Sequence, residues 1–124
     1  MIQIATENAP AAIGPYCQAT VHNGFVFTSG QIPLDPATGQ LAQATIQAQA
    51  AQSLTNLKAI VEQAGGTLDN IVKTTVFLKD MNDFVEMNRV YKTFFAADCP
   101  ARSAVQVAKL PKDVMVEIEA IAVL

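Results

Sequence analysis

The sequence predicts an α+β fold in which a single sheet carries two helices on one face. Two observations predict it. Short runs rich in β-branched and aromatic residues are interleaved with two longer segments of helical periodicity, and the last strand carries apolar residues on both sides. The chain has 124 residues, of which 51% are hydrophobic, which is enough for one core and too little for two ordinary domains. We therefore treat residues 1–124 as one domain.

The first elements form a predicted β-hairpin followed by a loop. Gln18 to Val21 and Phe25 to Thr28 are extended runs, and His22-Asn23-Gly24 joins them. An Asn-Gly pair between such runs favours a tight hairpin turn. The next segment, 31–40, contains two prolines and a glycine, which a helix or a central strand would not tolerate. It is predicted to be a loop.

A long amphipathic helix and a strand follow the loop. From Ala44 to Ala64 apolar residues recur at intervals of three and four, and Gly65-Gly66 supplies a stop. Residues Asn70 to Lys79 are dominated by β-branched and aromatic side chains, which is typical of a strand. We therefore predict a helix followed by a strand.

A second helix is predicted to begin near Asn82 or Asp83, either of which can cap it. Glu86 is placed to complete a capping box with Asp83, and Cys99-Pro100 ends the segment. The side chains expected on its buried face are Phe84, Met87, Tyr91 and Phe94 or Phe95.

Two extended runs, 103–109 and 114–123, close the chain, and residues 110–113 join them. In the last run, strict alternation places Glu117 and Glu119 on one otherwise apolar face. Carboxylates on such a face are solvated, paired with a cation, or used in acid–base chemistry with a shifted pKa. The chain has no third helix to cover the second face of the sheet, so we expect it to self-associate.

Arg102 is the nearest arginine in sequence, and two adjacent strands would bring it near the glutamate face. Its planar fork of donors matches a carboxylate, which belongs either to Glu117 in an internal ion pair or to a ligand. Tyr16, Ser29 and Gly30 offer a phenol, a hydroxyl and a close backbone approach, or they simply form turns. The residues alone leave these alternatives open.

Composition and missing motifs exclude several classes of protein. The net charge of −3 and the lack of a Lys/Arg cluster count against a nucleic-acid partner. No signal-peptide pattern and no run of about 18 apolar residues occurs, so we expect a cytoplasmic protein with no membrane partner. Two distant cysteines and one histidine, His22, predict no metal site, no disulfide and no Ser-His-Asp triad.

Five blocks in order carry a resemblance to a known family: APAAIGPY, TSGQIP, PARSAV, LPKDV and VEIEAIA. They resemble the RidA/YjgF family, also called the L-PSP endoribonuclease family, from near the first residue to the last. The resemblance implies a chorismate-mutase-like fold, a relative of the ferredoxin-like fold. It also implies a homotrimer whose sheets form a central barrel with a ligand cleft at each subunit interface.

The implied activity is hydrolysis of 2-iminobutanoate and 2-iminopropanoate, which PLP-dependent dehydratases release, to 2-keto acids and ammonia. No cofactor or metal is implied. By the same resemblance, Arg102 clamps the substrate carboxylate, and Glu117 holds a water and passes a proton to the imine. The positions that resemble the lining of the family's pocket are Tyr16, Ser29, Gly30 and Asn88.

One departure from the family pattern concerns Ala104. Many members have a cysteine two residues after the arginine, and its replacement by Ala104 removes any role for that thiol. We expect this position to contribute its backbone groups to the bound water, so that activity survives.

Two alternative functions stay open. The same fold can be a non-enzymatic trimer that binds small carboxylates such as 2-keto acids and acts as a regulator. Replacing Glu117 discriminates between the two, because it would abolish turnover and leave binding intact. The ribonuclease activity or translation inhibition attributed to some members is the second alternative, against which the acidic balance counts.

Overall fold

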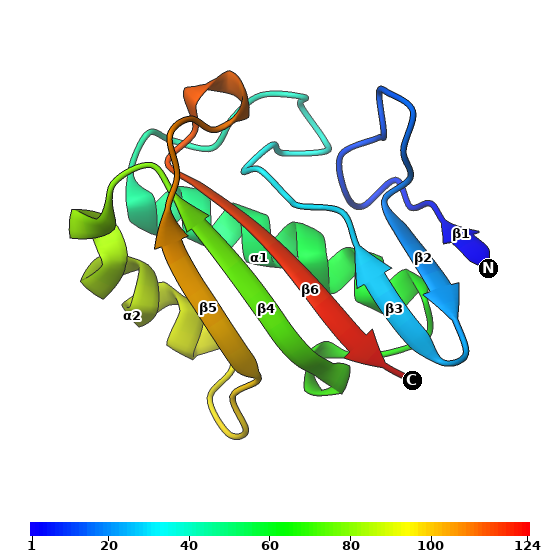
Figure 1. Ribbon diagram of the computed structural model, residues 1–124. Coiled ribbons are helices and arrows are strands. Elements are labelled where there is room, and N and C mark those ends of the chain that lie inside the picture. Colours follow the sequence, from blue (N-terminus) through cyan, green and yellow to red (C-terminus); the bar gives the residue numbers. More distant parts are fainter.

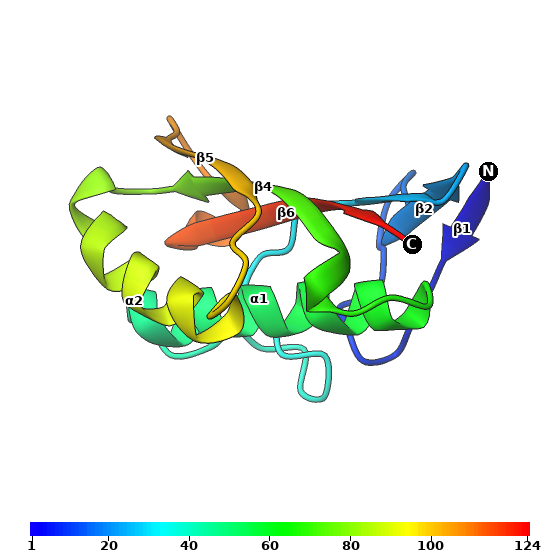
Figure 2. The ribbon, with the colours of Figure 1, turned by 90° about the horizontal axis from the view of Figure 1, so that it is seen from below.

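The structure is a computed structural model that describes residues 1–124. One mixed six-stranded sheet, in the order β1-β2-β3-β6-β4-β5, carries both helices on one face (Figures 1 and 2). This confirms the predicted α+β class. The elements are β1 (Ile2–Ile4), β2 (Ala19–His22), β3 (Phe25–Thr28), α1 (Ile46–Gln63), β4 (Ile71–Leu78), α2 (Phe84–Phe94), β5 (Ala101–Gln106) and β6 (Val116–Val123).

The N-terminal hairpin is confirmed, and an unpredicted strand lies beside it. His22 pairs with Phe25, so Asn23 and Gly24 alone make the turn, with φ of 49° and 78°. Positive φ at both positions matches the twist of the flanking strands. The three residues of β1 pair with β2 at the edge of the sheet. They are too few to display an alternating pattern, which is why the sequence did not predict them.

The predicted limits of α1 are close to the observed ones. The Thr45 side chain accepts a hydrogen bond from the backbone N–H of Ala48 at 3.2 Å. At the other end, Gly65 and Gly66 donate to the carbonyls of Glu62 and Val61, each at 3.0 Å. Gly65 has a φ of 102°, which favours glycine. The two glycines thus form the Schellman stop that the sequence predicts.

The predicted start of α2 is confirmed, because the helix begins at Phe84 with Asp83 in the N-cap position, but the predicted capping box is wrong. The side chain that caps here is Asp80, which accepts from the Asn82 N–H at 2.9 Å in a 3-10 turn that precedes α2. Asp83 makes no capping hydrogen bond, and Glu86 instead pairs with Arg89 at 3.3 Å. The side-chain cap therefore belongs to the extra turn and not to α2 itself.

The last two strands are not neighbours, contrary to the adjacency that would have brought Arg102 to the glutamate face. β4 lies between them, parallel to β5 and antiparallel to β6 (Figure 1). The segment β4-α2-β5 is a crossover unit, in which parallel strands are joined through a helix. β6 then enters between β3 and β4, and this central position explains its apolar residues on both faces.

The second face of the sheet carries no helix, as expected (Figure 2). Phe25 and Phe27 of β3 stack at 6.1 Å between centroids and keep 43% and 45% of their surface exposed. Ile121 and Val123 lie opposite them in register on β6. On the covered face, the alternate residues of β6 are buried, as the alternation predicts. No helix is long and apolar enough to cross a membrane.

Candidate functional site

Glu117 of β6 lines a cavity of about 530 Å³ at the open face of the sheet. Tyr16 from the loop before β2, Gly30 and Gln31 from the segment after β3, and Lys112 from the turn before β6 also line it. Three of the predicted site residues, Tyr16, Gly30 and Glu117, therefore share one hollow. They come from segments that are far apart in the sequence.

Gly30 lies directly against the Glu117 carboxylate. A Cβ built at this position would overlap Oε2 and would lie 2.8 Å from Cδ. Gly30 does not have a positive φ, so the lack of space, and not the backbone conformation, requires glycine here. The glycine therefore fixes where the carboxylate can be.

Burial raises the pKa of Glu117 above its ordinary value, and the neighbouring Glu119 carboxylate raises it further. Both causes disfavour the charged form of the group. A carboxyl group with a raised pKa in a cavity exchanges protons closer to neutral pH than an ordinary glutamate does. The position thus suits proton transfer.

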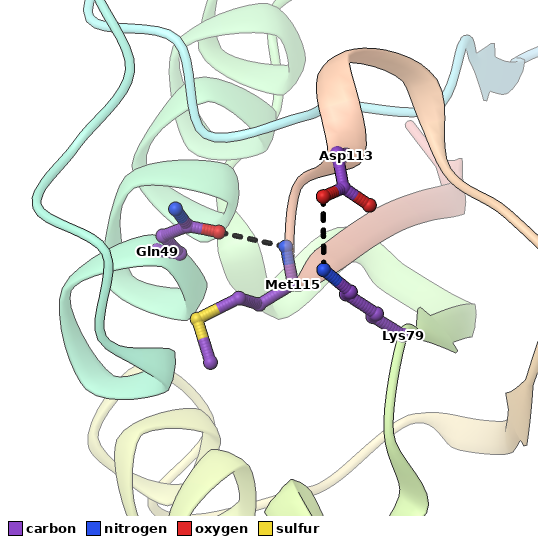
Figure 3. A network of polar contacts seen from close by, with 4 residues as sticks. All are labelled: Gln49, Lys79, Asp113 and Met115. Atoms are coloured by element: carbon purple, nitrogen blue, oxygen red, sulfur yellow. Dashed lines mark hydrogen bonds and ion pairs between the residues drawn. The ribbon is translucent and has the colours of Figure 1, made fainter.

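The turn that leads into β6 is anchored from two sides, as Figure 3 shows. The Met115 N–H donates to Oε1 of the buried Gln49 of α1 at 2.8 Å, and Lys79 pairs with Asp113 at 3.0 Å. Lys112 and Asp113 have φ of 55° and 56°, a left-handed backbone conformation that residues other than glycine rarely adopt. These anchors hold the strained turn, which ends four residues before Glu117.

The side chains of Ser29 and Tyr16 differ in how accessible they are to a ligand. The Ser29 hydroxyl donates to the carbonyl of Cys17 at 2.6 Å, which ties the end of β3 to the loop before β2. Tyr16 is 54% exposed and lines both the cavity of Glu117 and a second hollow of about 860 Å³ along the N-terminal segment. A ligand can therefore contact the Tyr16 phenol without breaking this hydrogen bond, whereas the Ser29 hydroxyl can donate to a ligand only by giving up the Cys17 carbonyl.

Arg102 lies on β5, the edge strand, and faces α2. Its Nη1 donates to Oδ1 of Asn88 at 2.7 Å. Its Cζ lies 4.7 Å from the ring centroid of Tyr91 and 5.3 Å from that of Phe84. A cavity of about 430 Å³, lined by Arg102, Asn88 and Cys99 among others, opens beside it.

Arg102 and Glu117 are not brought together within one chain. In the strand register, Arg102 pairs with Thr74 of β4, and Glu117 pairs with Phe77 of the same strand. Arg102 and Glu117 are therefore three positions apart along the strands and two strands apart across the sheet. That is roughly 10 Å in each direction. Thr74 is buried beneath the helices, whereas Glu117 lies on the open face. The alternative of an internal Arg102–Glu117 ion pair is therefore wrong.

Ala104 lies on the same side of β5 as Arg102 and packs against the core. In a parallel pair, only every second residue of a strand directs its backbone N–H and C=O toward the neighbouring strand. The Val107 N–H donates to the Leu78 carbonyl of β4, so the odd-numbered residues of β5 are the ones that pair with β4. The backbone groups of Arg102 and Ala104 therefore point to the free edge of the sheet, where a ligand can reach them.

Sequence reasoning did not foresee that Phe84 and Tyr91 contact Arg102, because it placed both residues on the buried face of the helix. The available signal was their spacing. Residues 84, 88 and 91 follow the i, i+4, i+7 pattern of one helix face, and Asn88 was already a candidate.

The fold and the site define a small α+β protein that presents a protonatable carboxyl group in a cavity and an ordered arginine at a sheet edge. A model of the family described as Endoribonuclease L-PSP matches residues 6–124. The chain belongs to this family, as the resemblance in its sequence implies.

Known relatives match nearly the whole chain. A Salmonella typhimurium protein named 2-iminobutanoate/2-iminopropanoate deaminase is 62% identical over 123 residues, covering 97% of this chain and 95% of the relative. The Escherichia coli K12 protein of the same name is 60% identical with the same coverage. The solved structure of E. coli TdcF with bound serine has a TM-score of 0.96 and 54% identity, covering 100% of this chain and 99% of the other.

Proposed function

We propose that the protein is a deaminase that hydrolyses 2-iminobutanoate and 2-iminopropanoate to 2-keto acids and ammonia. The identity of 60–62% to proteins named for this activity supports the proposal. The observation that carries it is the Glu117 carboxyl group, which is held against Gly30 in a cavity and has a raised pKa. We place the activity in the cytoplasm, on imines released by PLP-dependent dehydratases.

The proposal includes a homotrimer with a site at each subunit interface. Arg102 and Glu117 are on opposite faces of the sheet and two strands apart, so one chain cannot apply both to one small molecule. The uncovered face with Phe25 and Phe27 also needs a partner surface. In the trimer the sheets form a central barrel, and Arg102 of the partner subunit completes the cavity of Glu117.

In the proposed mechanism Arg102 binds the substrate carboxylate. Because Asn88 occupies Nη1, the remaining guanidinium donors are left for a two-pronged contact with the ligand. Tyr16, Ser29 and Gly30 line the pocket, and the backbone of Ala104 at the free edge helps to hold the attacking water. This arrangement supplies orientation and excludes bulk water.

Glu117 then moves the proton. As a carboxylate it takes a proton from the water that attacks the imine carbon and passes that proton to the nitrogen, which gives a carbinolamine. It then takes the proton of the carbinolamine hydroxyl and passes it to the same nitrogen, so that the C=O bond forms as the C–N bond breaks and ammonia leaves. The products are a 2-keto acid and ammonia, so one water is consumed for each imine. No strong nucleophile is required, because orientation and proton transfer by one carboxyl group suffice for this reaction.

The test couples the purified protein to a threonine dehydratase and follows the formation of 2-ketobutyrate. Native protein should accelerate the reaction, and Arg102→Ala and Glu117→Ala should not. Binding of 2-ketobutyrate should be lost in Arg102→Ala and kept in Glu117→Ala. Absence of acceleration by the native chain, with binding intact, would instead support a carboxylate sensor. Sedimentation as a monomer would contradict the interface site.

A further inference from the structure

We propose that Phe84 and Tyr91 are positioning residues for Arg102. They hold the guanidinium group between two aromatic rings on α2 and so set how tightly the protein binds a carboxylate. This inference rests on the proposed function, because it assigns the substrate carboxylate to Arg102.

The geometry of α2 fits this role. Phe84 and Tyr91 are seven residues apart on one helix face, which corresponds to roughly 10.5 Å along the axis. The Arg102 Cζ lies 5.3 Å from the first ring centroid and 4.7 Å from the second, both within the range of cation–π attraction. Asn88, one turn after Phe84, accepts from Nη1 at 2.7 Å. The guanidinium group is thus held on two sides by rings and on a third by a hydrogen bond.

The Tyr91 ring is itself fixed. Its hydroxyl hydrogen-bonds the Thr74 hydroxyl at 2.7 Å, and both residues are buried. Phe95 packs against the same ring at 4.7 Å between centroids. Burial raises the pKa of the Tyr91 hydroxyl above its ordinary value. Thr74 is also the register partner of Arg102 on β4. One buried pair therefore ties the helix to the strand beside the arginine.

Immobilising the arginine before the substrate arrives has an energetic consequence. A free arginine side chain carries about 2 kcal/mol of rotamer entropy, part of which is lost when it binds a ligand. A side chain that is already ordered loses less on binding. Lysine has no planar face for the two rings and no fork of donors, so it cannot replace arginine here. The two rings should act on substrate affinity and leave proton transfer by Glu117 unaffected.

The test compares kinetic and binding constants of the assembled native protein with those of Phe84→Leu, Tyr91→Leu and Tyr91→Phe. Each leucine variant should raise KM and the Kd for 2-ketobutyrate by roughly 3- to 30-fold, the range that a desolvated cation–π contact implies. The kcat should change less than threefold. Tyr91→Phe retains the ring and should stay within about threefold of the native KM. Phe94→Leu, on the same helix, is the matched control and should leave KM unchanged.

The outcomes separate this inference from the proposed function. Native protein that binds 2-ketobutyrate but hydrolyses no imine would refute the deaminase, and the Kd series would still test the two rings. If the native protein is active and Phe84→Leu keeps the native KM and Kd, the positioning role is overturned. A fall in kcat with KM unchanged would overturn it as well. Phe84 is only half-buried, so this variant decides the question even if Tyr91→Leu does not fold.

Discussion

Replacing Gly30 with alanine tests whether the glycine sets the position of the Glu117 carboxyl group. A Cβ at position 30 would lie 2.8 Å from the carboxyl carbon and overlap Oε2. A normal contact between carbon atoms is about 3.5 Å, so the carboxyl carbon must retreat by at least roughly 0.7 Å. Because a misplacement on the order of 1 Å costs about 100-fold in rate, we expect Gly30→Ala to lower kcat by about that factor.

The same substitution should cost only moderate stability. Overpacking typically costs about 1–3 kcal/mol, and here the displaced atoms belong to the end of a flexible side chain that borders a cavity. We expect a loss of about 1–2 kcal/mol in the free energy of unfolding, measured by urea denaturation. Gly14→Ala is the matched control, because its Cβ would meet only the Tyr16 ring, at 3.4 Å.

A double-mutant cycle identifies the cause of both effects. With Glu117 replaced by alanine, the added methyl group meets no carboxylate, so Gly30→Ala should then cost almost no stability. The reasoning is refuted if Gly30→Ala turns over substrate like the native protein. It is also refuted if the loss of stability persists in the Glu117→Ala background.

Three further predictions concern stability. Because the pKa of Glu117 is raised in the folded state, its ionisation disfavours folding as the pH rises through that pKa. Glu117→Gln should therefore raise the melting temperature at pH 8 and have no such effect at pH 4; an equal gain at both would contradict this. Gln49→Leu leaves the Met115 N–H without a partner and should cost about 1–3 kcal/mol in urea denaturation, whereas Asp113→Asn breaks an exposed ion pair and should cost less than about 1 kcal/mol. Similar losses of stability in Gln49→Leu and Asp113→Asn would contradict the expectation that the buried contact contributes more than the exposed ion pair. Ser53→Ala removes a buried hydroxyl that has no partner and should stabilise the protein by on the order of 1 kcal/mol in the same assay, and destabilisation would reveal an unseen partner.

Local signals in the sequence were sufficient for most elements of the fold. The Asn23-Gly24 turn and the Gly65-Gly66 stop depend on backbone preferences of neighbouring residues, and both were predicted correctly. The start of α2 was also predicted correctly, but its capping box was not, because Asp80 caps an additional 3-10 turn before the helix. Whether such a turn forms depends on where the preceding strand ends.

Most candidate site residues were chosen from their chemistry and position in the sequence and then assigned roles by the family resemblance, and the structure supplies the physical reasons for some of them. Gly30 reads as an ordinary turn glycine in the sequence, yet it is required by a carboxylate 87 positions away along the chain. The spacing of residues 84, 88 and 91 indicates one helix face, but that this face meets Arg102 depends on the parallel pairing of β4 with β5. Contacts of this kind depend on strand order, which no local pattern encodes.

The sequence by itself determined the α+β class, the alternation of β6 and the family, because periodicity and motif order are local properties of the chain. The tertiary structure alone decided that β6 lies between β3 and β4, and with it that Arg102 and Glu117 face opposite sides of the sheet. The physical reason is that a sheet can be threaded in several orders with the same strands. The choice among them follows from how the crossover helix and the core pack together.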